Sequence, residues 1–233
     1  MANGLKTAAI AAIVAAAFGF LGAGAWSWSG MADSRTREYL LDNPQLLQQM
    51  ADNYQKQQAQ QRVAQVAGDV RTPFSGAIIG NPNGSKVLVE FTDYNCPYCR
   101  QSMEDVKKLV AEDDDVKVVI REWPIFEGST IAARMALAAA MQGKYEAFHD
   151  AMFRLGPVTA QSVRAAAQEA GLDLERAQKD GESPAVDEEL QRNLAMAQAL
   201  GFGGTPSWVT ADNAFEGAVG LAGLKSALEG GDR

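Results

Sequence analysis

Residues 86–99 read KVLVEFTDYNCPYC, and this stretch decides how the rest of the chain is interpreted. Lys86 to Thr92 is a nearly continuous apolar run, which predicts a central β-strand covered on both faces. Cys96-Pro97-Tyr98-Cys99 follows that strand and opens a predicted helix from Pro97 to Ala111. The two cysteines are therefore expected at the start of a helix that follows a buried strand.

This position predicts redox chemistry for the cysteine pair. The free N–H groups and positive dipole of a helix start favour an anion, so we expect the pKa of Cys96 to fall to roughly 3.5–7.5. Cys96 is then the attacking and leaving sulfur of thiol–disulfide exchange, and Cys99 resolves the mixed disulfide. Pro97 and Tyr98, between the two sulfurs, are expected to tune the thiolate and contact a bound peptide. A zinc half-site shared between chains, or a pair of inert thiols, would not explain the strand-then-helix placement.

The composition excludes several other classes of protein. The 233-residue chain has a net charge of −8 and no basic run, which argues against a nucleic-acid partner. Two cysteines and one histidine cannot supply the four ligands of a structural zinc site. That histidine, His149, lies between aromatic residues and is expected to pack or hydrogen-bond locally. We expect no metal and no cofactor other than a redox-active Cys96–Cys99 disulfide.

The N-terminus predicts export of the rest of the chain. Thr7 to Trp28 contains no charged residue and is long enough to cross the roughly 30 Å hydrocarbon layer of a membrane. Lys6 before it favours an N-terminus in the cytoplasm, with the following residues outside. Trp26 and Trp28 suit a membrane interface, which favours an inner-membrane anchor with the catalytic domain in the periplasm. The alternative is a secretory signal cleaved at about Ala25, which leaves a periplasmic protein.

A polar, glutamine-rich segment follows from Asp33 to Ala67 and predicts a helical stalk. Asn43 is expected to cap a helix whose first position is Pro44. This helix carries an apolar stripe made of Leu46, Leu47, Met50 and Tyr54. Such a stripe needs a partner surface, which another copy of the chain or the protein's own domain could supply. Residues 68–73 then predict a hinge. The expected organisation is an anchor or signal at 1–30, a stalk at 31–70 and a domain at 71–233.

The segment after the cysteine helix predicts a second strand and then a long helical region. Val116 to Pro124 reads as a strand. Residues 128–201 are alanine-rich, and breaks at 143, 156–157, 171 and 181–184 predict about four helices. A final hairpin is predicted at Trp208, Val209 and Phe215 to Val219, before a helix from Leu221 to Leu228.

The sequence from about Ile78 to the C-terminal end resembles the thioredoxin superfamily, in particular its exported DsbA-like branch. Residues 90–99 are similar to the strand and active-site helix of that family, and Gly203-Gly204-Thr205-Pro206 is similar to its cis-proline loop. The Cys-Pro-Tyr-Cys choice, the stalk and the threonine before Pro206 are closer to ScsC and DsbG than to the simplest DsbA-like oxidases. The stalk does not match their dimerisation domain residue by residue.

The resemblance implies an α/β thioredoxin fold whose helical insertion, at about residues 128–201, caps the active site. It implies a cis Pro206 beside the cysteines, with the Thr205 backbone presented to a bound peptide. It also implies that Glu90, six positions before Cys96, helps to move the proton of Cys99. Burial on a central strand would raise the pKa of Glu90 toward neutrality, whereas a solvated glutamate at a sheet edge would have no such role.

These observations predict an exported thiol–disulfide oxidoreductase that acts on cysteine-containing exported proteins. The motif leaves formation, isomerisation and reduction of disulfides open, because they differ in redox potential and electron partner. We expect a membrane redox partner to recharge the pair, and self-association through the stalk is an open alternative. The competing function is a Cu(I)-binding or chaperone module that uses Cys96 and Cys99 as soft ligands.

Overall fold

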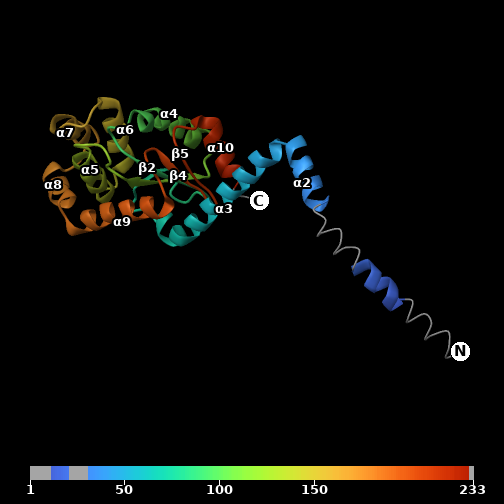
Figure 1. Ribbon diagram of the computed structural model, residues 1–233. Coiled ribbons are helices and arrows are strands. Elements are labelled where there is room, and N and C mark those ends of the chain that lie inside the picture. The colour runs from blue at the N-terminus through green and yellow to red at the C-terminus, as the bar shows by residue number, and fades with distance from the viewer. Residues whose placement is uncertain (1–11, 21–30, 231–233) are drawn as a thin grey trace. The chain divides into compact units, whose positions relative to one another are not determined.

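The computed structural model describes residues 12–20 and 31–230 (Figure 1). The chain divides into two compact units, residues 1–55 and residues 56–233. Most of the predicted membrane segment, including the cleavage site at Ala25, lies outside the described residues; residues 12–20 within it are helical. In the ranges that the structure does describe, no helix combines the length and apolar character needed to span a bilayer.

The first unit contains α2 (Met31–Asp42) and the start of α3 (Gln45–Val70). The sequence predicted that Asn43 caps α3, but its side chain does not do so. Its amide nitrogen donates to the carbonyl oxygen of Tyr39 at 2.8 Å, and its backbone carbonyl accepts the N–H of Leu46 at 3.0 Å. The reason is α2, which the sequence did not predict as a separate helix and which ends just before Asn43: the carbonyl oxygen of Tyr39 in its last turn accepts both the backbone N–H of Asn43, at 3.0 Å, and the side-chain amide.

The second unit is built on a mixed sheet whose strands, among the described residues, have the order β1-β3-β2-β4-β5. The predicted strand is β2 (Lys86–Thr92), and it lies at the centre, parallel to β3 (Val116–Glu122) and antiparallel to β4. The predicted hairpin is the antiparallel pair β4 (Ser207–Val209) and β5 (Ala214–Glu216). The sequence missed the edge strand β1 (Ile78–Gly80), which is too short to carry a periodic pattern.

Alternation along the strands sends side chains to two separate cores. Leu88, Ile120 and Trp208 point to a face covered by α4 (Pro97–Glu112), α10 (Gly220–Gly230) and the helical insertion. Val89, Phe91 and Val119 point to the opposite face, which contains Val63 and Val70 of α3 and Leu200 of α9. The central strand is therefore covered on both sides, as its apolar run predicts.

The insertion contains five helices rather than the four predicted, in a segment that the structure describes in full. The predicted breaks are correct, and four breaks separate five segments. The helices are α5 (Thr130–Met141), α6 (Tyr145–Leu155), α7 (Ala160–Glu169), α8 (Leu174–Gly181) and α9 (Pro184–Leu200). Helices α5 to α8 gather at one end of the unit (Figure 1).

The predicted hinge at residues 68–73 is helical at its start, because α3 continues through Gly68 to Val70. Residues 56–70 belong to the same compact unit as the sheet. Arg121 of β3 holds the end of α3: its guanidinium donates to the carbonyl oxygens of Asp69, Val70 and Thr72. The helix therefore ends against a buried cation.

Arg121 also forms a buried ion pair with Glu189 of α9, with Nη1 and Oε1 2.6 Å apart and both side chains at most 3% exposed. Arg121→Met should lower the free energy of unfolding by about 3–5 kcal/mol, because it leaves the Glu189 charge buried without a partner. Urea unfolding followed by circular dichroism measures this change. Arg154→Met is the matched control, since its pair with Glu169 is more than half exposed and should contribute little. Equal losses in the two variants would contradict this account of Arg121.

Candidate functional site

The local chain path places the two cysteines at the end of the central strand. β2 ends at Thr92, a short loop follows, and α4 begins at Pro97, which occupies the first helical position where a missing N–H costs nothing. Cys96 is the N-cap residue, with extended backbone. Cys96 and Cys99 are 2% and 0% exposed, whereas Tyr98 between them is 62% exposed. The site is thus a buried sulfur pair beside an exposed aromatic ring.

The two cysteines are close together and have opposite acidities. Both thiols are free, and they lie 3.4 Å apart. Hydrogen bonding from the Cys99 thiol, with further help from Thr205 and the backbone N–H groups of Cys99 and Tyr98, lowers the pKa of Cys96 to about 5. Burial, the neighbouring Cys96 sulfur and the charge of Glu90 raise the pKa of Cys99 well above its ordinary value. At neutral pH the pair is one thiolate and one thiol.

The loop at Thr205 and Pro206 meets the cysteine pair from the far end of the chain. The Thr205–Pro206 peptide bond is cis, and the carbonyl oxygen of Thr205 lies 3.1 Å from Sγ of Cys96. The carboxylate of Glu216 on β5 holds this loop by accepting the N–H groups of Gly203 and Gly204 at 2.9 and 3.1 Å. The sequence did not identify Glu216, because its partners lie in a loop that only the hairpin brings near.

Glu90 lies on β2, on the sheet face that α4 covers, and it is 1% exposed. Its Oε2 atom is buried without a hydrogen-bond partner. Burial raises the pKa of Glu90 to about 8, against the opposing effect of the Thr92 hydroxyl and with smaller contributions from Glu122 and Cys96. This is the buried carboxyl that the central strand predicts, rather than a solvated side chain at a sheet edge.

A second carboxylate, Asp93, fixes the loop that carries the cysteines. Its Oδ2 accepts the N–H groups of Ile125 and Phe126 at 2.7 and 2.9 Å, and its Oδ1 accepts the N–H of Asn95 and the hydroxyl of Ser129 at 2.7 and 2.5 Å. These bonds tie the loop before Cys96 to the segment between β3 and α5. Sequence analysis missed Asp93, because three of its four partners, all but Asn95, follow it by 32 to 36 positions.

Asn95 links the loop before Cys96 to the helical insertion by hydrogen bonds. Its amide nitrogen donates to the Ser129 hydroxyl at 3.0 Å, and its Oδ1 accepts the N–H of Val158 at 2.9 Å. Since Val158 lies between α6 and α7, the insertion fixes the active-site loop directly.

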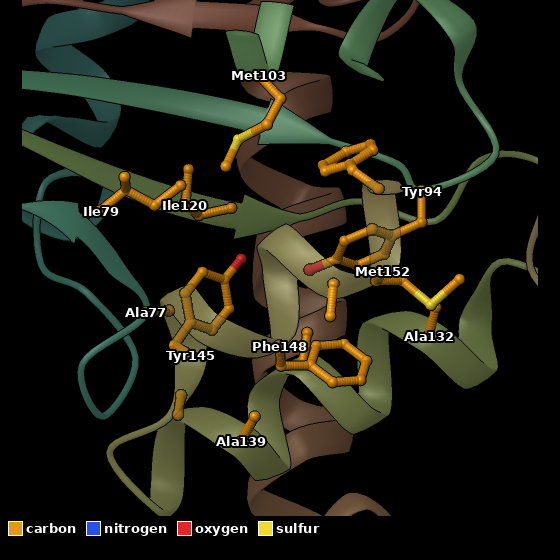
Figure 2. Packing of buried hydrophobic residues seen from close by; sticks show 14 of the residues in the cluster. Ala77, Ile79, Tyr94, Met103, Ile120, Ala132, Ala139, Tyr145, Phe148 and Met152 are labelled. Carbon is orange, nitrogen blue, oxygen red and sulfur yellow. The ribbon is translucent and has the colours of Figure 1, made fainter. Parts of the chain in front are cut away.

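A cluster of buried polar side chains lies beyond Glu90. The hydroxyls of Tyr94 and Tyr145 both donate to Glu122 of β3, and Figure 2 shows them turned toward the same space. His149 is buried, packs against the rings of Tyr94, Tyr145 and Phe153, and approaches the Tyr94 hydroxyl at 2.8 Å through Nδ1. The prediction that His149 packs and hydrogen-bonds locally is confirmed. Glu122 was not predicted as a site residue, because it ends a strand that also carries Lys117 and Arg121, so its charge does not stand out in the sequence.

The structure therefore brings Cys96, Cys99, Glu90, Thr205 and Pro206 together. Pro97 and Tyr98 lie at the exposed start of α4. Across residues 12–20 and 31–230, no group of three or more histidine, cysteine, aspartate or glutamate side chains is arranged to hold a metal ion. An ionised sulfur, a protonated sulfur and a buried carboxyl can together carry out thiol–disulfide exchange.

Comparison with known proteins agrees with this chemistry. A thioredoxin-like oxidoreductase of Silicibacter pomeroyi is 46% identical, with a TM-score of 0.65 over 68% of this chain and 92% of that one. The catalytic domain of Proteus mirabilis ScsC is 26% identical, with a TM-score of 0.66 over 74% of this chain and 97% of that domain. Both are similar to this chain in fold.

A curated relative is much longer than the part that matches. The Na(+)/H(+) antiporter NhaA of Herminiimonas arsenicoxydans is 34% identical over 158 residues, which make up 67% of this chain and 25% of that protein. The match thus spans about a quarter of the length of the relative.

The DSBA-like thioredoxin domain family has a model that matches residues 87–229, from the central strand through the insertion to the last helix. With the cis-proline loop, the cysteine pair and the helical insertion all in place, the chain belongs to the DsbA-like thioredoxin family of thiol–disulfide oxidoreductases.

Proposed function

We propose that this protein exchanges disulfides with cysteine-containing exported proteins through its Cys-Pro-Tyr-Cys pair. The observation that carries the proposal is the unequal acidity of two neighbouring sulfurs, with the pKa of Cys96 at about 5 and that of Cys99 raised. Exchange proceeds by attack of a thiolate on a disulfide sulfur, so the ionised Cys96 is the sulfur that attacks and leaves. Cys99, protonated and buried, resolves the mixed disulfide.

The acidity of Cys96 also favours one direction of exchange. A stabilised thiolate stabilises the reduced pair, and a pair whose reduced form is stable is an oxidant when it carries its disulfide. We therefore propose that the disulfide form donates its disulfide to client proteins. In that direction the client is oxidised and the Cys96–Cys99 pair becomes a dithiol.

The loop at Thr205 supports a docking mode for the client. The carbonyl oxygen of Thr205 lies beside the Cys96 sulfur, and Pro206 after it has no N–H of its own. An extended client segment can therefore pair with the Thr205 backbone while its sulfur reaches Cys96. Tyr98 and Pro97, both exposed, supply apolar contacts on the other side of that sulfur.

Glu90 donates a proton to Cys99 and accepts it back. A carboxyl whose pKa is about 8 can hold a proton near neutrality and can accept it back. Glu90 then protonates the Cys99 sulfur when the disulfide opens, and it removes that proton when the disulfide forms again.

The family resemblance supports a periplasmic site for this reaction, where exported proteins acquire disulfides. A membrane redox partner that accepts two electrons from the dithiol would restore the disulfide after each cycle. Redox chemistry of this kind needs no metal or organic cofactor, because the sulfur pair itself carries the electrons.

The first unit supports self-association. Apolar side chains of α2 and α3 line a groove of about 670 Å³, including Leu40, Leu41, Leu47 and Met50. Leu41, Leu47 and Met50 are 69%, 75% and 63% exposed. We propose that a second copy of the chain covers this groove, since burying such side chains stabilises each by about 1.5–3 kcal/mol.

Titration of the reduced protein tests the acidity of Cys96. Thiolate absorbance should rise with a midpoint near pH 5 and be lost in Cys96→Ala. Since the folded pKa lies below the unfolded value of about 8.5, this ionisation stabilises the reduced protein fully above about pH 8.5. That stabilisation should be lost as pH falls through about 5, and Cys96→Ala should lose this part of the pH dependence. A midpoint near 8.5 would contradict the assigned role.

Exchange assays test the function itself. The wild-type protein should catalyse insulin reduction or refolding of a scrambled substrate, and Cys96→Ala should abolish both, because it removes the attacking sulfur. Cys99→Ala should accumulate mixed disulfides with the substrate, because attack survives and resolution does not. Glu104→Gln, on the exposed side of α4, is the control and should behave as wild type.

Identical behaviour of wild type and Cys96→Ala in both assays would reject the enzyme, and Cu(I) titration would then test the soft-ligand alternative. Measurement of the redox potential against glutathione tests the direction of exchange. A potential as reducing as about −270 mV, the value for thioredoxin, would overturn the proposed donation of disulfides.

Sedimentation equilibrium of the full chain tests the groove in the first unit. The wild type should have the mass of an oligomer, and the double variant Leu47→Glu, Met50→Glu should be monomeric because it places two charges in an apolar interface. Gln57→Glu adds a charge to an exposed position of the same helix and should leave the mass unchanged. A monomeric wild type would refute self-association.

A further inference from the structure

A second buried carboxyl, Glu122, lies on the same face of the sheet as Glu90. The two parallel strands pair Glu90 with Ile120 and Thr92 with Glu122. Glu122 is therefore offset from Glu90 by two residues along the strands, and both side chains project to the same face of the sheet. Glu90 is 1% exposed and Glu122 is fully buried. Each has an Oε2 atom that is buried without a hydrogen-bond partner. Two carboxyls thus share one water-poor space behind the cysteines.

Glu122 is held firmly on its other oxygen. The hydroxyls of Tyr94 and Tyr145 donate to Oε1 of Glu122 at 2.9 and 2.6 Å. Nδ1 of His149 lies 2.8 Å from the Tyr94 oxygen and 3.3 Å from the Tyr145 oxygen. Because both hydroxyls donate to Glu122, the His149 ring supplies the N–H of these contacts. Burial lowers the pKa of His149 to about 3, so the ring is neutral and brings no charge to the cluster.

The other titratable and charged groups around Glu122 come from two elements. Burial raises the pKa of Glu122 to about 8, and the charge of Asp93, in the loop after β2, contributes in the same direction. Lys107 of α4 acts on His149 and lowers its pKa. Cys96 and Cys99 face Glu90 rather than Glu122. Among these groups, the two phenols are the ones that lower the pKa of Glu122.

Two neighbouring carboxyls in such a space cannot both ionise easily. When one ionises, its charge raises the pKa of the other, so the pair loses its protons in two separate steps. Glu122 receives two O–H donors on one oxygen, and donors of this kind favour the charged form. Glu90 has its Oε2 atom unpaired and lies near the Cys96 thiolate, which favours its neutral form. The first proton therefore leaves Glu122, and the second stays on Glu90.

We propose that Glu122 is a positioning residue of the exchange reaction: once its carboxyl, held by Tyr94 and Tyr145, has ionised, its charge keeps a proton on Glu90 for delivery to the Cys99 sulfur. The proposal rests on the proposed function and extends it to a residue that does not touch the sulfurs. It explains why a buried carboxyl on β3 receives one hydroxyl from the loop before Cys96 and one from the helical insertion.

A client thiolate attacks Sγ of Cys96, a bond forms between the client sulfur and Cys96, and the Cys96–Cys99 bond breaks. The electron pair of that bond leaves on Sγ of Cys99, which takes the proton of Glu90. A second client thiolate then attacks the client sulfur and releases Cys96 as the thiolate. The client is oxidised by two electrons, the cysteine pair is reduced by two, and Glu90 is left ionised until it takes the proton back from Cys99 when the disulfide forms again.

Stopped-flow reduction of the Cys96–Cys99 disulfide by glutathione tests the proposal. Rates are measured from pH 6 to pH 10 and normalised to the glutathione thiolate, so that the remaining fall at high pH reports loss of the proton from Glu90. Glu122→Gln keeps the shape and an oxygen acceptor for the two tyrosines but removes the charge. We expect the midpoint of this fall to move down by about one pH unit, and Glu90→Gln to abolish the fall.

Glu104→Gln removes the same formal charge from the exposed face of α4 and should leave the midpoint unchanged. Carbon-13 NMR of the glutamate carboxyl carbons gives an independent readout. Glu122 should titrate before Glu90 in the wild type, and Tyr145→Phe should raise the pKa of Glu122 because it removes one donor.

The outcomes separate the two proposals. A wild type that glutathione reduces no faster than a model disulfide would refute the proposed function. An active wild type in which Glu122→Gln lowers the rate equally at every pH would overturn the positioning role and leave only a packing role. The same conclusion would follow if NMR showed Glu90 losing its proton before Glu122.

Discussion

The unpaired N–H groups at the start of α4 are the constraint on which the rest of this site depends. They can stabilise a negative sulfur only if Cys96 is held at the N-cap with its backbone extended, which is the conformation that it has. Pro97 contributes because it fixes the first helical position without withdrawing a donor. The sulfur is nearly buried, so the N–H groups and the Cys99 thiol replace the hydration that its charge would otherwise receive.

That arrangement requires a rigid frame, and the frame comes from segments far apart in the sequence. Asp93 and Asn95 tie the loop before the cysteines to the segments around Ser129 and Val158. Glu216 fixes the loop that brings Thr205 to the sulfur. The helical insertion is therefore more than a cover, because it supplies partners for the loop and two of the side chains around Glu122.

The sheet organises the buried acids in the same way. Because side chains alternate, one face of β2 and β3 carries Glu90 and Glu122 toward the cysteines, while the other carries Arg121 toward Glu189 and the end of α3. The charged groups on the two faces differ in function. The ion pair on the far face is a structural link, whereas the carboxyls on the near face have no cation among their hydrogen-bond partners and so retain protons.

The sequence by itself determined the central strand, the helix that starts at Pro97, the cysteine pair and the breaks of the insertion. Each of these depends on residues close together in the chain: an apolar run, a proline at a helix start and glycines between helices. It also indicated Glu90, through the resemblance of residues 90–99 to the thioredoxin superfamily, in which an acidic residue stands six positions before the first cysteine. Only the tertiary structure decided that Asp93, Glu122 and Glu216 belong to the site, since their partners are distant in sequence and a charged residue beside a strand or turn is ordinarily solvated. The length of α3 was decided in the same way, because Gly68 remains helical only where the sheet and Arg121 receive the end of that helix.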